Sequence, residues 1–143
     1  MTSIPDMMQP GTWKYFPRGG GGARKEGDAL VLNFTRKSSG PVAEETELRY
    51  GHLAYAVGKS YRLKFSAKAA SPMRIRVAVQ VDIPPYQKEL ADPVPVALTT
   101  EWQDVDMKLE FTKPNPDPLC SLGFLLGDKP NTVSFRNMSL VPE

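Results

Sequence analysis

The residue types that most often do chemistry are rare in this sequence. It contains one cysteine, Cys120, and one histidine, His52, among 143 residues. A zinc site with four Cys or His ligands and a disulfide within the chain are therefore both excluded. His52 has no motif around it, which is typical of a surface residue near a turn. Cys120 lies in an apolar segment, which favours a small core side chain over a nucleophile.

Carboxylates are the other candidates for catalysis, because a pair of them can hydrolyse a glycosidic bond. Two groups have a suitable spacing: Asp104 with Asp106, and the run Glu44, Glu45 and Glu47. Outward carboxylates that alternate along a strand are more often a solvated face. The sequence also lacks nucleophile-elbow, phosphate-loop and metalloprotease motifs. We therefore expect no catalytic residue and no enzymatic activity.

The segments that must position any site are strands with alternating apolar residues. Residues 73–82 place five apolar side chains on one face and leave Arg74, Arg76 and Gln80 on the other. Residues 60–69 alternate in the same way. The tight connection Ala70-Ser71-Pro72 predicts that these two strands pair with each other antiparallel.

Further strands follow from the same reasoning. The segment 119–126 is apolar in both phases, which predicts a central strand covered on both faces. In the last strand the apolar phase changes after Phe135, which predicts a β-bulge near Asn137. Two irregular stretches, Gly19–Gly22 and Ile83–Pro93, are expected to be loops. The remaining candidate strands are 12–16, 30–34, 42–50 and 103–112.

These eight or nine strands, separated by turns rich in the 14 Pro and 11 Gly, predict an all-β fold, a sandwich of two antiparallel sheets. The length fits a single domain over residues 1–143, in which residues 1–10 can serve as a flexible lead-in. No stretch approaches the roughly 20 apolar residues of a membrane span, so no membrane partner is expected. A net charge of +2 is too small to predict a nucleic-acid partner.

The middle and C-terminal parts of the chain carry a family pattern. The segment Val57-Gly58-Lys59-Ser60-Tyr61-Arg62-Leu63-Lys64-Phe65-Ser66-Ala67-Lys68-Ala69 contains G-K-x-Y-x-L-x-F-x-A-K-A, and Leu98-Thr99-Thr100-Glu101-Trp102-Gln103 contains L-T-x-x-W-Q. With residues 122–127 and 133–140, these segments resemble, in order and spacing, the carbohydrate-binding modules of the group that includes families 4, 9 and 22. The resemblance implies a jelly-roll β-sandwich of the galactose-binding-like type, with a polysaccharide groove on its concave sheet.

The sequence departs from this family where many members hold structural calcium. Those members place an acidic residue in a final D-N-V strand, and the matching position here is Arg136. The N-terminal G-x-F-E segment of the family is not recognisable in residues 1–13. Calcium needs several oxygen ligands brought together. We therefore expect no metal and no other cofactor.

The resemblance directs attention to planar polar side chains and aromatic rings, which hydrogen-bond and stack on sugars. Tyr50 shares its phase with a core leucine, so core packing explains it at least as well as sugar stacking. Trp13 is either a platform near the groove or an anchor for the first strand. Trp102 matches a position that is usually structural. The predicted carbohydrate-binding residues are Arg74, Arg76, Gln80 and Tyr86, with Tyr50, Glu47 and Trp13 as looser assignments.

The predicted function is non-catalytic binding of a plant or microbial polysaccharide, such as β-glucan or xylan. A monomeric module of this kind would tether a glycoside hydrolase domain of its parent chain to the substrate. The N-terminus has no signal-peptide pattern, which leaves a cytoplasmic protein or a module excised from an extracellular or periplasmic one. The alternative is a structural or protein-interaction sandwich that has lost sugar binding. Exposed aromatic rings along a groove would favour polysaccharide binding, and a flat charged face would favour the structural or protein-interaction alternative.

Overall fold

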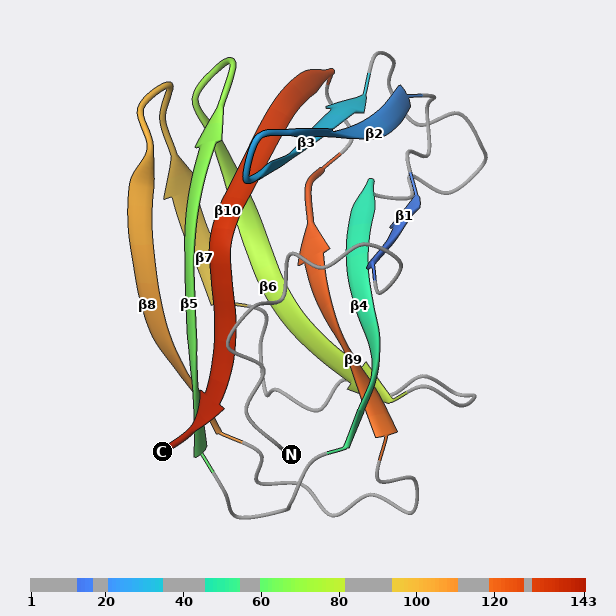
Figure 1. Cartoon of the computed structure of the whole chain (residues 1–143), viewed down its shortest axis with the longest axis vertical. Helices are drawn as coiled ribbons and strands as arrows, with labels where there is room; N and C mark the ends of the chain where they lie inside the picture. The colour runs from blue at the N-terminus through green and yellow to red at the C-terminus, as the bar shows by residue number, and fades with distance from the viewer. Residues whose placement is uncertain are drawn as a thin grey trace.

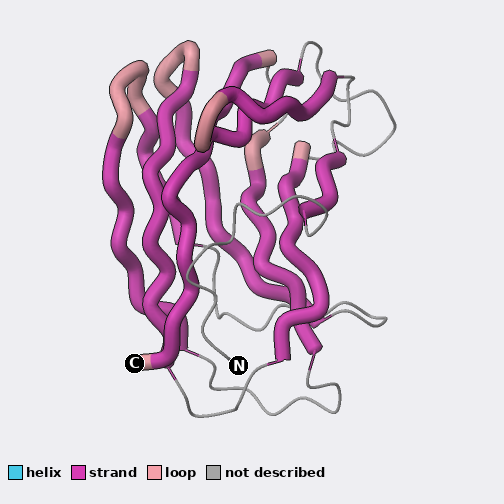
Figure 2. The backbone as a smooth tube through the Cα atoms, viewed as in Figure 1, coloured by secondary structure: helices cyan, strands magenta, loops and turns pink. Residues whose placement is uncertain are grey.

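The computed structural model describes residues 13–16, 21–34, 46–54, 60–81, 94–110, 119–127 and 130–143. All regular structure in these ranges is β-strand (Figures 1 and 2). They contain no helix long and apolar enough to cross a membrane. The strands are β1 (Trp13–Phe16), β2 (Gly21–Glu26), β3 (Ala29–Phe34), β4 (Glu47–Ala54), β5 (Ser60–Ala69), β6 (Met73–Val81), β7 (Val94–Leu98), β8 (Gln103–Glu110), β9 (Leu119–Leu125) and β10 (Asn131–Pro142).

The strands form two antiparallel sheets of five strands each, which face each other in Figure 1. The first, here called the front sheet, has the order β1-β4-β9-β6-β7, and the second, the back sheet, has the order β2-β3-β10-β5-β8. The predicted all-β sandwich is confirmed, and β9 is the central strand that its apolar sequence indicated.

Two strands, β2 and β7, were not expected from the sequence. All six residues of β2 are exposed, so its sequence lacks the apolar alternation that marks a half-buried strand. Gly21 and Gly22 belong to β2, and the prediction of a loop at these two residues is wrong. β7 contains Pro95, and a proline within a short apolar run argues against a strand except at a sheet edge, where β7 lies.

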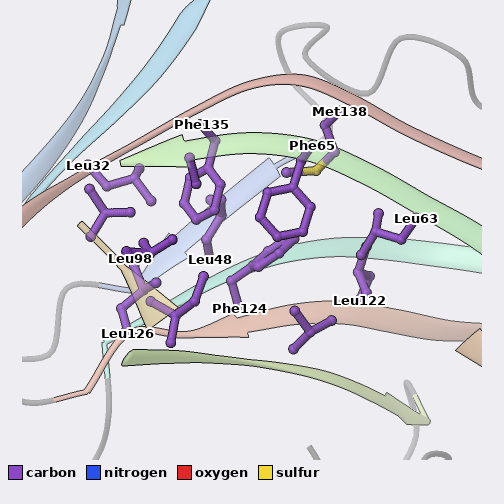
Figure 3. Packing of buried hydrophobic residues seen from close by; sticks show 14 of the residues in the cluster. Leu32, Leu48, Leu63, Phe65, Leu98, Leu122, Phe124, Leu126, Phe135 and Met138 are labelled. Carbon is purple, nitrogen blue, oxygen red and sulfur yellow. The ribbon is translucent and has the colours of Figure 1, made fainter. Parts of the chain in front are cut away.

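The core fills the space between the sheets with the apolar side of each alternating strand (Figure 3). Ile75 and Val77 of β6 are fully buried, as the period-two pattern predicts. Phe124 of β9 is the centre of an aromatic cluster. Its ring centroid lies 5.3 Å from that of Phe65 in β5 and 5.0 Å from that of Phe135 in β10. Rings at these separations attract each other beyond the area that they bury, so the cluster holds the two sheets together.

The predicted pairing of β5 with β6 is wrong, because the connection between them crosses from the back sheet to the front sheet. Two strands that each have one apolar face can bury those faces either as neighbours in a sheet or across a core. The sequence of a short turn does not distinguish these arrangements. Here the Asn131 side chain holds the turn. Its Nδ2 donates to the Ser71 carbonyl at 3.0 Å, and its Oδ1 accepts from the Ser71 N–H at 3.1 Å.

The predicted β-bulge in the last strand is confirmed. Asn137 has a φ of 55°, in the left-handed region, and the register of β10 against β5 shifts between Arg136 and Ser139. Asparagine tolerates this backbone conformation better than most residues. Because one extra residue is inserted, Met138 and Leu140 point into the core on the opposite sequence parity from Phe135.

A hydrogen bond from Tyr15 links the edge of the front sheet to the back sheet. The Tyr15 hydroxyl on β1 donates to the Asn33 carbonyl on β3 at 2.9 Å. Burial raises the pKa of Tyr15 from 10.0 to about 12, because the phenolate is poorly solvated there.

This shift predicts that stability falls at alkaline pH. The unfolded chain releases the Tyr15 proton near pH 10.0, whereas the folded chain retains it until about 12. The stability that this tyrosine contributes is therefore fully present below pH 10.0 and is lost as the pH rises through the folded-state value. Urea unfolding across this range is expected to give a shallower pH dependence for Tyr15→Phe than for the parent chain. Equal slopes would contradict the prediction.

Candidate functional site

The outer face of the front sheet carries the predicted binding residues of β6. Arg74 is exposed and Arg76 is half-buried, and both alternate with the buried residues of the same strand. The backbone of Gln80 continues this side of β6, but its side chain and all of Tyr86 lie outside the described residues. The described side chains and glycines of this face, hereafter the front face, are Lys14, Glu47, Arg49, Gly51, Arg74, Arg76, Ala78, Pro95, Ala97, Ser121, Gly123 and Leu125.

The strand register brings distant residues into rows across the front face. Glu47 on β4 is opposite Leu125 on β9, which is in turn opposite Arg76 on β6. Neighbouring strands lie about 4.8 Å apart, so Glu47 and Arg76 are separated by about 10 Å in the row. The structure thus brings together Glu47 and Arg76, which the sequence analysis predicted separately.

Glu47 is held in place by Arg49, two residues along the same side of β4. The Arg49 Nε lies 3.1 Å from Oε1 of Glu47, and its Nη2 lies 3.0 Å from Oε2, so both carboxylate oxygens accept a hydrogen bond. The side chains are only 12% exposed for Glu47 and 26% for Arg49. A two-point pair of this kind fixes the plane of the carboxylate as well as its position.

The space for the Glu47 carboxylate exists because residue 123 is a glycine. A Cβ atom at Gly123 would lie 2.8 Å from Oε1 of Glu47, closer than such atoms approach in proteins. Ala78 is opposite Gly123 on β6, and Ser121 lies two residues from Gly123 along β9. Both small residues are buried although they belong to the outer side of the sheet. The centre of the front face is therefore a floor of small residues, beside which a carboxylate and a guanidinium are fixed.

At one end of the sandwich, between the turn after β5 and the start of β10, lies an open hollow of about 390 Å³. This volume falls in the range of small-molecule sites. Arg74, one of the outward arginines of β6, borders this hollow. The same Asn131 that holds the turn after β5 also borders it. The lining residues are Ser71, Pro72, Met73, Arg74, Leu126, Gly127, Pro130 and Asn131.

Trp13 and Tyr50 lie on the inner side of the front sheet. They are register partners on β1 and β4, and their ring centroids are 5.0 Å apart with an interplanar angle of 72°. The Trp13 ring also lies 5.9 Å from that of Phe124 in the core. This placement agrees with the alternatives in which Trp13 anchors the first strand and Tyr50 packs in the core. The two rings are partly buried against the core and are not on the face that carries Arg76.

The sequence analysis missed Arg49, Lys14 and Gly123. The alternation of Leu48 and Tyr50, which packs Tyr50 inward, could have placed Arg49 on the outer side of β4. The same argument applies to Lys14, between Trp13 and Tyr15. Gly123 has no such signal, because its importance depends on which residue of β4 lies opposite it.

The calcium position of the resembled family has a different structure here. The guanidinium carbon of Arg136 lies 4.0 Å from the Trp102 ring centroid, and Lys68 Nζ lies 4.9 Å from it. A guanidinium stacked on an indole is a cation–π contact and offers no oxygen to a cation. Among the described residues, no three His, Cys, Asp or Glu side chains gather as metal ligands. Arg136 therefore does not fit the role of a calcium ligand, and the absence of a metal stays a prediction.

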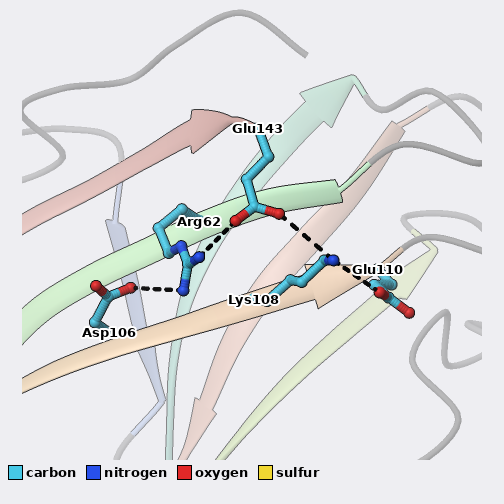
Figure 4. A network of polar contacts seen from close by, with 5 residues as sticks. All are labelled: Arg62, Asp106, Lys108, Glu110 and Glu143. Carbon is cyan, nitrogen blue, oxygen red and sulfur yellow. Dashed lines mark hydrogen bonds and ion pairs between the residues drawn. The ribbon is translucent and has the colours of Figure 1, made fainter.

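Asp104 and Asp106, the first pair considered for catalysis, lie on β8 of the back sheet, and Asp106 belongs to the charged network of Figure 4. Asp106 lies 3.3 Å from Arg62, which also contacts Glu143 at 2.6 Å. Asp104 accepts a hydrogen bond of 2.5 Å from the Ser66 hydroxyl. These arrangements are those of a solvated face, as the alternation predicted. Glu44, Glu45 and the side chains of His52 and Cys120 lie outside the described part of the chain.

Comparison with known proteins gives a likeness in structure. No model of a known protein family matches the chain, and no curated protein matches it in sequence. The chain is similar to the N-terminal cellulose-binding domain of β-1,4-glucanase C from Cellulomonas fimi, with a TM-score of 0.75 and 20% identity over 100% of this chain and 95% of that one. A second similar structure is a family 4 carbohydrate-binding module (TM-score 0.75, 17% identity, 99% and 94% covered).

A third similar structure is part of an enzyme. The arabinose-bound α-L-arabinofuranosidase MgGH51 matches 92% of this chain with a TM-score of 0.71 and 14% identity, but only 23% of the enzyme is covered. At these identities the likeness is one of fold. The chain therefore has the β-sandwich fold of carbohydrate-binding modules, which confirms the fold that the resemblance implied.

Proposed function

We propose that this chain binds polysaccharide on the front face and catalyses no reaction. The observation that supports this most strongly is the full-length match to the Cellulomonas domain, which is named for binding cellulose. The front face supplies suitable chemistry, because Glu47 and Arg49 are planar hydrogen-bonding groups held in fixed positions. Fixed groups lose little conformational entropy on binding, which favours recognition of a flexible polymer.

The proposal extends to the parent protein. The match to a 23% portion of an arabinofuranosidase chain supports a role as an accessory domain of a glycoside hydrolase. In that role the module acts as a monomer in an extracellular or periplasmic protein and keeps the catalytic domain near its substrate. The gain is one of effective concentration and requires no new catalytic group. β-Glucan and xylan are the first polymers to test as ligands.

The test is native electrophoresis in gels that contain β-glucan, xylan, mannan or a pectic polymer. At least one polymer is expected to retard the protein relative to a non-binding reference protein. Arg49→Gln should reduce the retardation. Arg62→Gln, which also removes an arginine paired with a carboxylate but lies on the back sheet, should leave it unchanged. Migration unaffected by all four polymers would contradict the proposed function.

A second function, protein recognition, is favoured by one observation. Most described side chains of the front face are charged or small, and none is an aromatic ring that could stack on a sugar. A flat charged face suits a protein partner of complementary charge, which it would select by electrostatics. Two results together would establish this alternative. No polysaccharide retards the protein, and the protein forms a defined complex with another protein that Arg49→Gln weakens.

A further inference from the structure

The front face concentrates positive charge. Its described residues carry four cations, Lys14, Arg49, Arg74 and Arg76, against one anion, Glu47. The formal net charge of this face is therefore +3, whereas the whole chain carries only +2. Ion pairs occur on both sheets: Arg49 pairs with Glu47 on the front face, and Arg24 with Glu26 and Lys108 with Glu110 on the back sheet.

Two of the four cations lie in line along β6, beside the Glu47–Arg49 pair. Glu47 accepts one hydrogen bond from Arg49 at each oxygen, so it neutralises the charge of Arg49 and keeps further acceptor capacity on each oxygen. Arg74 is exposed and lies on the same side of β6 as Arg76, two residues away. Alternate residues of a strand are about 6.6 Å apart along it. The β6 guanidinium groups therefore form a line of planar donors, which match carboxylate groups better than neutral hydroxyls.

The absence of stacking rings supports the same reading. The described rings of the front sheet, Trp13, Tyr15, Tyr50 and Phe124, all pack toward the core. A neutral, extended polysaccharide offers only C–H faces and hydroxyls, and its binding depends on aromatic platforms. The described part of the front face lacks such platforms and offers charge in their place.

We propose that the ligand of the front face is an acidic polysaccharide, one that carries uronic-acid carboxylates along its chain. This inference rests on the proposed function and names the chemical class of its ligand. Arg74 and Arg76 donate to successive carboxylates along the polymer. Single-stranded nucleic acid is disfavoured as the partner, because the described face has no aromatic ring on which bases could stack.

The experiment compares polymers that share a backbone and differ in charge. Isothermal titration calorimetry would use polygalacturonate against its methyl-esterified form, and carboxymethylcellulose against hydroxyethylcellulose. The acidic member of at least one pair is expected to bind at least tenfold more tightly, and its affinity should decrease with added salt. Arg76→Gln should lower that affinity about tenfold. Lys64→Gln, the same loss of charge at an exposed site on the back sheet, should not.

The outcomes separate this inference from the proposed function. If the neutral polymers bind as tightly as the acidic ones, the acidic class is wrong and polysaccharide binding stands. If none of the four polymers binds and the electrophoresis panel is also negative, both are wrong. Equal effects of Arg76→Gln and Lys64→Gln, or tighter binding of a single-stranded oligonucleotide than of polygalacturonate, would indicate general polyanion binding and overturn the inference.

Discussion

Replacing Phe124 with alanine is expected to lower the free energy of unfolding by about 3–5 kcal/mol. The Phe124 ring is fully buried and contacts Phe65 and Phe135 of the back sheet and Trp13 of the front sheet. Its loss leaves a cavity between the sheets and removes three ring contacts at once. Typical domains are stable by 5–15 kcal/mol, so the variant should lose a large part of its stability. Urea unfolding followed by circular dichroism measures the change.

The next residue in the strand provides the control. Leu125 lies on the front face, is half-buried and contributes to no ring cluster. Leu125→Ala should therefore lower the free energy of unfolding by less than about 1.5 kcal/mol. Comparable losses for Phe124→Ala and Leu125→Ala would show that the aromatic cluster does not hold the sheets together.

Gly123→Val is expected to lower polysaccharide affinity at least tenfold, about 1.4 kcal/mol of binding free energy, while the fold is retained. The new Cβ would lie 2.8 Å from Oε1 of Glu47, so the carboxylate must move and its pairing with Arg49 must change. Valine itself suits a strand, which limits the loss of stability.

The matched substitution is Gly22→Val on β2 of the back sheet. A Cβ at Gly22 would meet no atom within 4 Å, and the residue is exposed. This variant should bind the polymer that the parent chain binds with unchanged affinity. Titration calorimetry with that polymer and urea unfolding of both variants give the comparison. Unchanged affinity in Gly123→Val would place the ligand away from the centre of the front face.

The parts of the fold that could be predicted from the sequence are those that depend on local alternation. The pattern of β6 predicts which residues are buried, and the same pattern places Arg74 and Arg76 on the outer side. The phase change in β10 predicts the bulge at Asn137. Alternation shows only that one face of a strand is buried, and each of these predictions depends on that fact alone.

Predictions that need a partner strand were less successful. The pairing of β5 with β6 is wrong because alternation is the same whether two faces meet across a core or lie side by side. The pairing of Arg49 with Glu47, and the need for glycine at position 123, follow from the register of β4 and β9. A single sequence does not contain that register. The roles of Gln80 and Tyr86 in binding stay predictions.

The position of β10 in the back sheet has a consequence for the way the protein is made. This strand follows the other nine in sequence, yet it lies between β3 and β5 at the centre of its sheet. On the ribosome, β2 and β3 can form a hairpin, and β5 can pair with β8, but these two halves remain unjoined until residues 131–142 emerge. Until then each half exposes an unpaired strand edge and an apolar face, which favour aggregation. Nascent chains stalled before residue 131 should therefore depend on chaperones, whereas chains released after residue 142 should not.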